Sequence, residues 1–155
     1  MSDIAFEILK EKDVEKSVDM VTSSLVRHGV SEPINREVIK QMIFSRNVLT
    51  LIAKKERKIL GLISGTTMFT PNINILSVID EGDIGKYVGE LLISRFVEEI
   101  KKNFPKNRYV TVTLTTDNTK AISEYSSKGF VIKGFVREGI EEKDVVILAK
   151  DTRRT

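Results

Sequence analysis

The sequence predicts an α+β protein whose mixed, mostly antiparallel central sheet has about seven strands and carries helices on both faces. Two observations lead to this prediction. Segments that read as strands or helices follow one another in the order β-α-α-β-β-β-α-β-α-β-β. Only some of the strands are joined through helices, which disfavours a regular doubly wound parallel sheet. The 155 residues suit a single domain, and no linker or internal repeat divides residues 1–155.

The first half of the chain reads as one strand, two helices and three further strands. Asp13 can cap the first helix, and Pro33 with Asn35 opens the second. A charged turn at residues 55–58 separates two apolar strands, and Pro71 ends the second of them. The expected elements cover residues 4–9, 14–29, 35–43, 48–54, 59–69 and 73–79.

The second half begins with a glycine-bearing loop that becomes a long amphipathic helix. Val88, Leu92, Phe96 and Ile100 recur every four residues on one face of this helix, and Pro105 ends it. The remaining elements are a β-branched strand, a short helix and a closing antiparallel pair. They cover residues 108–115, 118–128, 130–139 and 144–150.

The composition excludes several classes of protein. The chain has no cysteine and one histidine, His28, so disulfides, a cysteine nucleophile and thiolate metal sites are excluded, and we expect no metal ion. No apolar run approaches the ~20 residues that span a bilayer. The N-terminus lacks the apolar core of a secretory signal. We therefore expect a cytoplasmic protein that does not contact membranes.

The charge pattern does not point to nucleic acid. The net charge is +3, but 25 Lys and Arg are interspersed with 22 Asp and Glu, and only the tail KDTRRT is locally basic. Aromatic residues interleaved with basic ones, which stack on bases, are missing. Nucleic acid is therefore an unlikely partner, although a small nucleic-acid-binding domain is kept as a distant alternative. Such a domain would bind DNA or RNA with an affinity that falls steeply with salt.

Two segments carry chemistry. The segment IGKYVG, residues 84–89, lies between a strand and a helix, where free backbone N–H groups favour an anion. A plain strand-to-helix turn explains its glycines equally well. In DNTKAISEYSSKGF, residues 117–130, the side chain of Tyr125 faces inward from a short helix. On these residues alone it is either a core aromatic or a catalytic group.

Together, the two segments resemble the GNAT superfamily of N-acyltransferases. The family shows N-x-x-A-x-x-x-Y-x-x-x-G-F, and this chain matches every fixed position, with Asn118, Ala121, Tyr125, Gly129 and Phe130. The earlier family motif, Q/R-x-x-G-x-G/A, is matched only in part. Ile84 replaces Arg or Gln, and Tyr87 replaces a glycine. These departures favour one alternative, a catalytically degenerate GNAT-like binding or scaffold module.

The resemblance implies an acetyl-CoA-dependent N-acetyltransferase, in which a primary amine attacks the thioester directly. The cofactor arm would lie in a wedge between residues 73–79 and 108–115. Backbone amides of the first strand would hold the pantetheine, those of residues 85–90 the pyrophosphate, and Tyr125 would protonate the leaving thiolate. The implied cofactor contacts are Val78, Ile79, Ile84, Gly85, Lys86, Tyr87, Val88, Gly89, Glu90 and Asn118.

The general base and the acceptor stay open. No carboxylate lies inside residues 73–79, so Asp80, Glu81, His28 or a water chain remains as the base. By the resemblance, residues 26–34, 68–72 and 136–144 wall the acceptor cleft. The acceptor is a small amine, a peptide N-terminus or a protein lysine. A homodimer is possible, and the apolar strand DVVILA, residues 144–149, is a candidate to pair across subunits.

Overall fold

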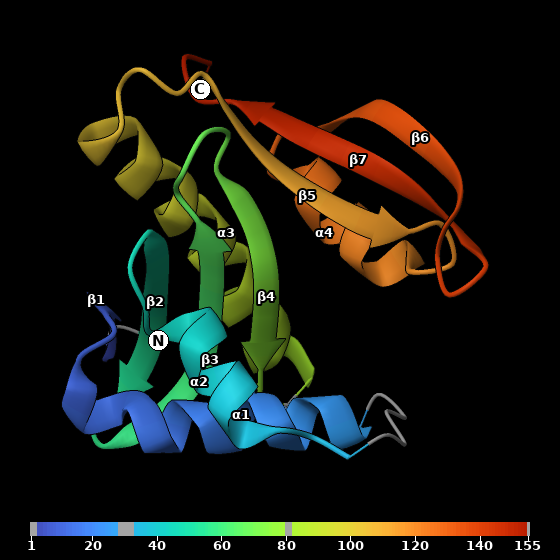
Figure 1. Ribbon diagram of the computed structural model, residues 1–155. Coiled ribbons are helices and arrows are strands. Elements are labelled where there is room, and N and C mark those ends of the chain that lie inside the picture. Colours follow the sequence, from blue (N-terminus) through green and yellow to red (C-terminus); the bar gives the residue numbers. More distant parts are fainter. Residues whose placement is uncertain (1–2, 28–32, 80–81, 155) are drawn as a thin grey trace.

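The computed structural model describes residues 3–27, 33–79 and 82–154. Within them the chain forms a seven-stranded sheet of order β1-β2-β3-β4-β5-β7-β6 (Figure 1). Neighbouring strands are antiparallel except β4 and β5, which are parallel. The predicted fold class and order of elements are confirmed. The elements are β1 (Ile4–Ile8), the short 3-10 helix η1 (Glu11–Asp13), α1 (Val14–Arg27), α2 (Arg36–Ile43), β2 (Val48–Lys55), β3 (Lys58–Thr66), β4 (Asn72–Val78), α3 (Gly82–Asn103), β5 (Tyr109–Thr115), α4 (Thr119–Ser127), β6 (Val131–Ile140) and β7 (Lys143–Asp151).

Helices cover both faces of the sheet. α1 and α2 pack on one face through an apolar cluster that includes Val18 and Ile39. α3 and α4 pack on the opposite face (Figure 1). Burying each large apolar side chain of this kind stabilises the fold by about 1.5–3 kcal/mol. The four predicted core positions of α3 have no exposed surface, namely Val88, Leu92, Phe96 and Ile100.

One predicted helix cap is confirmed and another is wrong. The side chain of Asn35 accepts hydrogen bonds from the N–H groups of Glu37 and Val38, so it caps α2 as expected. Asp13 instead ends η1, and its carboxylate accepts a hydrogen bond from Lys54 Nζ at 3.2 Å. Asp13 is buried, and a buried carboxylate needs a charged partner. Its carboxylate is bonded to Lys54 and does not cap α1.

The sheet divides into two halves between β4 and β5. These strands pair only through Asn72 with Thr111 and Ile73 with Val112. The Thr111 hydroxyl also donates to Asn72 Oδ1 at 2.8 Å, which closes this end. Beyond it, β4 continues along β3 and β5 continues along β7. The carboxyl ends of β4 and β5 therefore diverge (Figure 1), and the predicted wedge is present.

A β-bulge in β4 coincides with this divergence. Ser64 of β3 pairs with Ile75 and Gly65 pairs with Ile73, so Asn74 is the extra residue on β4. A bulge bends its strand and increases the local twist. It also changes which backbone groups face each side of the strand. The bulge thus turns β4 away from β5 where the wedge begins.

The glycine-bearing loop predicted at residues 84–89 is wrong, because α3 already begins at Gly82. Gly85 and Gly89 lie in its first turns and are buried. A Cβ on Gly85 would lie 2.5 Å from the carbonyl oxygen of Ile79. Gly85 therefore allows α3 to pack closely on the end of β4, a need that a sequence pattern cannot distinguish from a loop.

The strand suggested for pairing across subunits, DVVILA, does not lie at the edge of the sheet. It belongs to β7, which lies between β5 and β6 and pairs with both of them. Both hydrogen-bonding edges of β7 are thus occupied within the chain. The edge strand on this side of the sheet is β6.

Candidate active site

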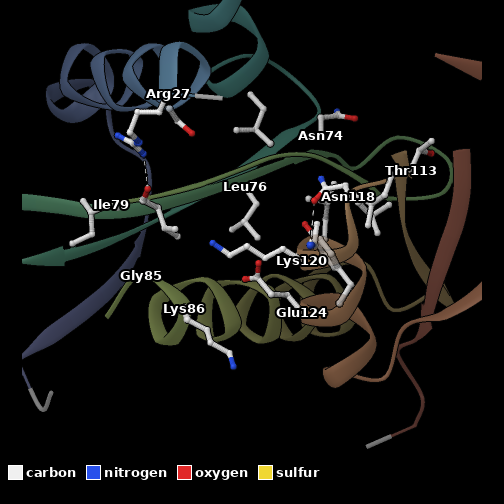
Figure 2. A pocket seen from close by; sticks show the side chains of 18 of the residues that line it. Arg27, Asn74, Leu76, Ile79, Gly85, Lys86, Thr113, Asn118, Lys120 and Glu124 are labelled. Atoms are coloured by element: carbon white, nitrogen blue, oxygen red, sulfur yellow. Dashed lines mark hydrogen bonds between the residues drawn. The ribbon is translucent and has the colours of Figure 1, made fainter. Parts of the chain in front are cut away.

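The wedge forms a cavity of about 390 Å³. β4 lies on one side of it, β5 and α4 on another, and the first turns of α3 lie below (Figure 2). The last turn of α1 reaches the same space. The lining residues are Ser24, Arg27, Ile73, Asn74, Ile75, Leu76, Val78, Ile79, Gly82, Gly85, Lys86, Val112, Thr113, Leu114, Asn118, Lys120, Ala121, Glu124 and Tyr125.

The edge of β4 that faces the wedge is only partly available. The N–H group of Ile79 donates to the carbonyl of Leu60 at 2.9 Å, so it is used inside the sheet. In an antiparallel pair, residues alternate between bonding to the partner strand and facing away from it. Val78 and Leu76 therefore direct their N–H groups toward the wedge. Of the two predicted pantetheine contacts, Val78 suits the role, whereas the amide of Ile79 does not.

Arg27 connects α1 to this edge. Its Nη2 atom donates to the carbonyl oxygen of Val78 at 3.0 Å (Figure 2). That carbonyl is on the wedge side of β4, as the alternation requires. A guanidinium group has further N–H donors, which remain for other acceptors at this end of the cavity.

Tyr125 lies at the wall of the cavity and is 2% exposed. Its ring packs edge-to-face on Phe130, with 5.2 Å between ring centroids. Burial raises the pKa of the Tyr125 phenol above its ordinary value, and the nearby Glu124 carboxylate raises it further. The phenol therefore keeps its proton throughout the neutral pH range, as a proton donor must. This position is compatible with both interpretations of Tyr125, a core aromatic and a catalytic group.

α4 contributes three polar side chains to the cavity. Asn118 Oδ1 accepts from the N–H of Ala121 at 3.3 Å and caps the helix, which leaves its side-chain NH₂ group as a donor. The side chain of Lys120 crosses the cleft beneath Leu76, and the carboxylate of Glu124 lies beside it (Figure 2). Within the described lining, the cations Arg27, Lys86 and Lys120 outnumber the one carboxylate, Glu124, which favours an anionic ligand.

The start of α3 supplies unpaired N–H groups, but three residues earlier than predicted. The first N–H groups of a helix have no partner inside it, and here these belong to Gly82, Asp83 and Ile84. The amides of the following residues are bonded within the helix. Tyr87 is 42% exposed and does not line the cavity. It therefore does not crowd this space.

The structure brings together about half of the predicted site and separates the rest. Six predicted residues line one cavity, namely Val78, Ile79, Gly85, Lys86, Asn118 and Tyr125. Five others are turned away or lie inside α3, namely Ile84, Tyr87, Val88, Gly89 and Glu90. Sequence reasoning missed Leu76, Lys120 and Glu124, which no motif marks; the helical spacing of 121, 124 and 125 was the available signal.

Other expected contributors are elsewhere or not described. The base candidates His28, Asp80 and Glu81 lie outside the described residues. The turn at residues 68–72 lies at the closed end of the wedge, where Thr111 bonds to Pro71. Among the described residues, no group of three or more His, Cys, Asp or Glu side chains is placed to hold a metal ion. No helix of the described part is long and apolar enough to cross a membrane.

Comparison with known proteins gives a fold. No family model matches the chain, and no curated protein sequence matches it. An N-acetyltransferase from Staphylococcus aureus Mu50 has a similar structure, with a TM-score of 0.81 over 97% of this chain and 99% of that one, at 16% identity. The chain has the GNAT fold.

Two further solved structures share the GNAT fold with this chain over nearly its whole length. The ribosomal-protein-S18-alanine N-acetyltransferase from Escherichia coli has a TM-score of 0.80 and 13% identity, covering 98% of this chain and 96% of that one. A spermidine N-acetyltransferase from Vibrio cholerae, in complex with CoA and spermine, has a TM-score of 0.78 and 15% identity, covering 99% and 98%. At such identities the likeness establishes the GNAT fold, and the site must carry the argument for activity.

Proposed function

We propose that this protein is an N-acetyltransferase that moves an acetyl group from acetyl-CoA to a primary amine by direct attack. The observation that carries the proposal is the β4–β5 wedge with Tyr125 on its wall and an open backbone edge on β4. An extended pantetheine arm has amide groups that pair with such an edge as a strand would. The CoA complex of the Vibrio cholerae enzyme, which shares the fold, supports the choice of cofactor.

Each part of the cavity has its own proposed role in binding acetyl-CoA. The N–H groups of Val78 and Leu76 hold the arm, and a backbone donor at this edge stabilises the oxyanion that forms on the thioester. The free N–H groups of Gly82 and Asp83, at the positive end of the α3 dipole, hold the diphosphate. Asn118 donates to the arm from α4. These contacts place the thioester toward Tyr125.

Tyr125 is the proposed general acid. When the tetrahedral intermediate collapses, its C–S bond breaks, and the phenol gives its proton to the departing sulfur. A thiol has a pKa of about 8.5 and an unperturbed phenol about 10, so the transfer is mildly uphill in water. Burial raises the pKa of the Tyr125 phenol. Burial in the same cavity also raises the pKa of the CoA thiol, so the two pKa values shift in the same direction.

The attacking amine must be neutral, yet no described carboxylate of β4 faces the thioester position. We propose that water in the open end of the cavity takes the amine proton to solvent. The acceptor is a small amine, a peptide N-terminus or a protein lysine. Relatives in fold are named for spermidine and for the alanine of a ribosomal protein, so both classes belong in the test.

A thiol-release assay tests the proposal. The chain has no cysteine, so a thiol reagent reports only CoA. Acetyl-CoA is mixed with spermidine, with a peptide that begins with alanine, or with a lysine peptide. We expect amine-dependent CoA release with at least one acceptor, and mass spectrometry should show 42 Da added to it, the mass of one acetyl group. Absence of acetyl-CoA binding in calorimetry at millimolar ligand would contradict the proposal.

A second candidate is a catalytically degenerate GNAT-like module that binds or scaffolds another molecule without turnover. The early start of α3 favours it, because residues 85–90 lie in the helix and do not form the phosphate-holding loop that the resemblance implies. The two candidates differ in both measurements. A degenerate module gives no calorimetric signal with acetyl-CoA and no CoA release with any acceptor. An enzyme gives both.

A further inference from the structure

Glu124 has an unusual place for a carboxylate. It lies on α4, lines the cavity and faces the second turn of α3. Its Oε2 atom is 3.1 Å from the position that a Cβ on Gly89 would occupy, so the missing side chain at Gly89 leaves the room that the carboxylate fills. Figure 2 shows it between Lys120 and α3.

The charges around Glu124 come from three elements. Lys120 is one turn earlier on α4, and Lys86 and Glu90 are on α3. Arg27 of α1 lines the same cavity at its other end. β4 and β5 contribute only apolar, Asn and Thr side chains to the lining. Within the described part of the chain, no cation is within 4 Å of the Glu124 carboxylate.

We propose that Glu124 is a charge gate in the part of the cavity that lies between α3 and α4, where the cofactor would enter. While ionised, it repels the anionic diphosphate arm of an acyl-CoA; once protonated, it admits that arm. This inference rests on the proposed function, since it concerns how the same cavity accepts acetyl-CoA. It goes further in naming one side chain that makes the affinity depend on pH.

Electrostatics gives the size and sign of the effect. One unit charge near a diphosphate in a partly buried cleft changes the affinity on the order of tenfold. Burial raises the pKa of Glu124, while Lys120 lowers it, Glu90 raises it and Lys86 lowers it. Its protonation thus begins at a higher pH than for an ordinary glutamate. The affinity for acetyl-CoA should rise as the pH falls, because the repelling charge disappears.

The experiment is calorimetry with CoA between pH 5 and 8 on the wild type, Glu124→Gln and Glu124→Ala. Glu98→Gln is the control, since Glu98 is an exposed carboxylate of α3 that does not line the cavity. We expect Glu124→Gln to bind CoA about tenfold more tightly than the wild type at pH 7.5. The difference should shrink toward pH 5. The 3′-phosphate of CoA titrates near pH 6 in every sample and cancels in the comparison.

Pantetheine, which lacks the diphosphate, separates charge from shape. It should bind the wild type and Glu124→Gln equally if repulsion is the cause. Equal or weaker CoA binding by both Glu124 variants at pH 7.5 would overturn the gate. A gain for pantetheine as large as the gain for CoA would also overturn it. If CoA binds to none of the proteins at any pH, the proposed function itself fails, and the gate fails with it.

Discussion

Arg27 Nη2 lies 3.0 Å from the carbonyl oxygen of Val78, so the last residue of α1 is hydrogen-bonded to the open edge of β4. This contact joins α1 to β4, the strand along which the thioester would bind. It fixes the direction of one backbone group at the mouth of the wedge. Changes at Arg27 should therefore alter the reaction without unfolding the protein.

Arg27→Ala should lower kcat/KM about tenfold, because Val78 loses one restraint and near-attack geometry is sensitive to small shifts. Stability should fall by about 1 kcal/mol or less, since Arg27 is exposed. Steady-state kinetics and urea unfolding measure the two effects. Arg36→Ala is the control, because Arg36 pairs with Glu15 and Asp19 and does not touch β4. Equal kinetics for both variants would contradict this role.

Tyr125→Phe should reduce kcat about 10²–10⁴-fold, the usual contribution of a positioned proton donor. The ring packing on Phe130 is retained, so folding and acetyl-CoA binding should be unchanged. Single-turnover CoA release, with calorimetry as the binding control, gives the answer. Retention of full kcat with a good acceptor would leave Tyr125 as a core aromatic only.

Tyr125 should also affect stability at alkaline pH. Its folded-state pKa is raised, so above about pH 10 the unfolded chain releases this proton while the folded chain keeps it. The folded state then binds more protons than the unfolded state, and stability falls as the pH rises. The melting temperature of the wild type should fall more steeply between pH 9 and 11 than that of Tyr125→Phe. Parallel curves would show that burial does not perturb this phenol.

Replacing single amides by esters distinguishes structural from ligand-facing N–H groups on β4. An ester at residue 79 removes the N–H that bonds to Leu60, so stability should fall by about 1 kcal/mol with little change in CoA affinity. An ester at residue 78 should do the reverse, because the Val78 N–H faces the wedge. Urea unfolding and calorimetry provide both values. A stability loss at 78 as large as at 79 would show that the assigned alternation is incorrect.

Gly85→Ala should destabilise the protein by about 1–3 kcal/mol, because the new Cβ meets the Ile79 carbonyl at 2.5 Å and α3 must shift. Gly134→Ala is the control, since its Cβ would make an ordinary 3.4 Å contact with Ile147. Denaturant unfolding of the two variants compares them directly. Similar small losses would mean that α3 moves without cost.

The predicted parts of the site depend on residues close together in the sequence, whereas the missed parts depend on contacts between distant segments. Asn118 and Tyr125 line the cavity, and the sequence could indicate both because their positions are set within one short helix. Ile79 was assigned wrongly because its N–H bonds to Leu60, which is distant in the chain and set by strand register. Glu124 was missed because its proximity to Gly89 exists only after α3 and α4 pack together.

The sequence alone determined the order of elements, the core face of α3 and the position of the short helix, because periodicity, caps and prolines act over a few residues. The tertiary structure alone decided where β4 leaves β5, which amides face the wedge and where α3 starts. Those features depend on a bulge at Asn74 and on the close approach of Gly85 to Ile79. Both arise from contacts between segments that are distant in the chain, so the local pattern of apolar and polar residues does not predict them.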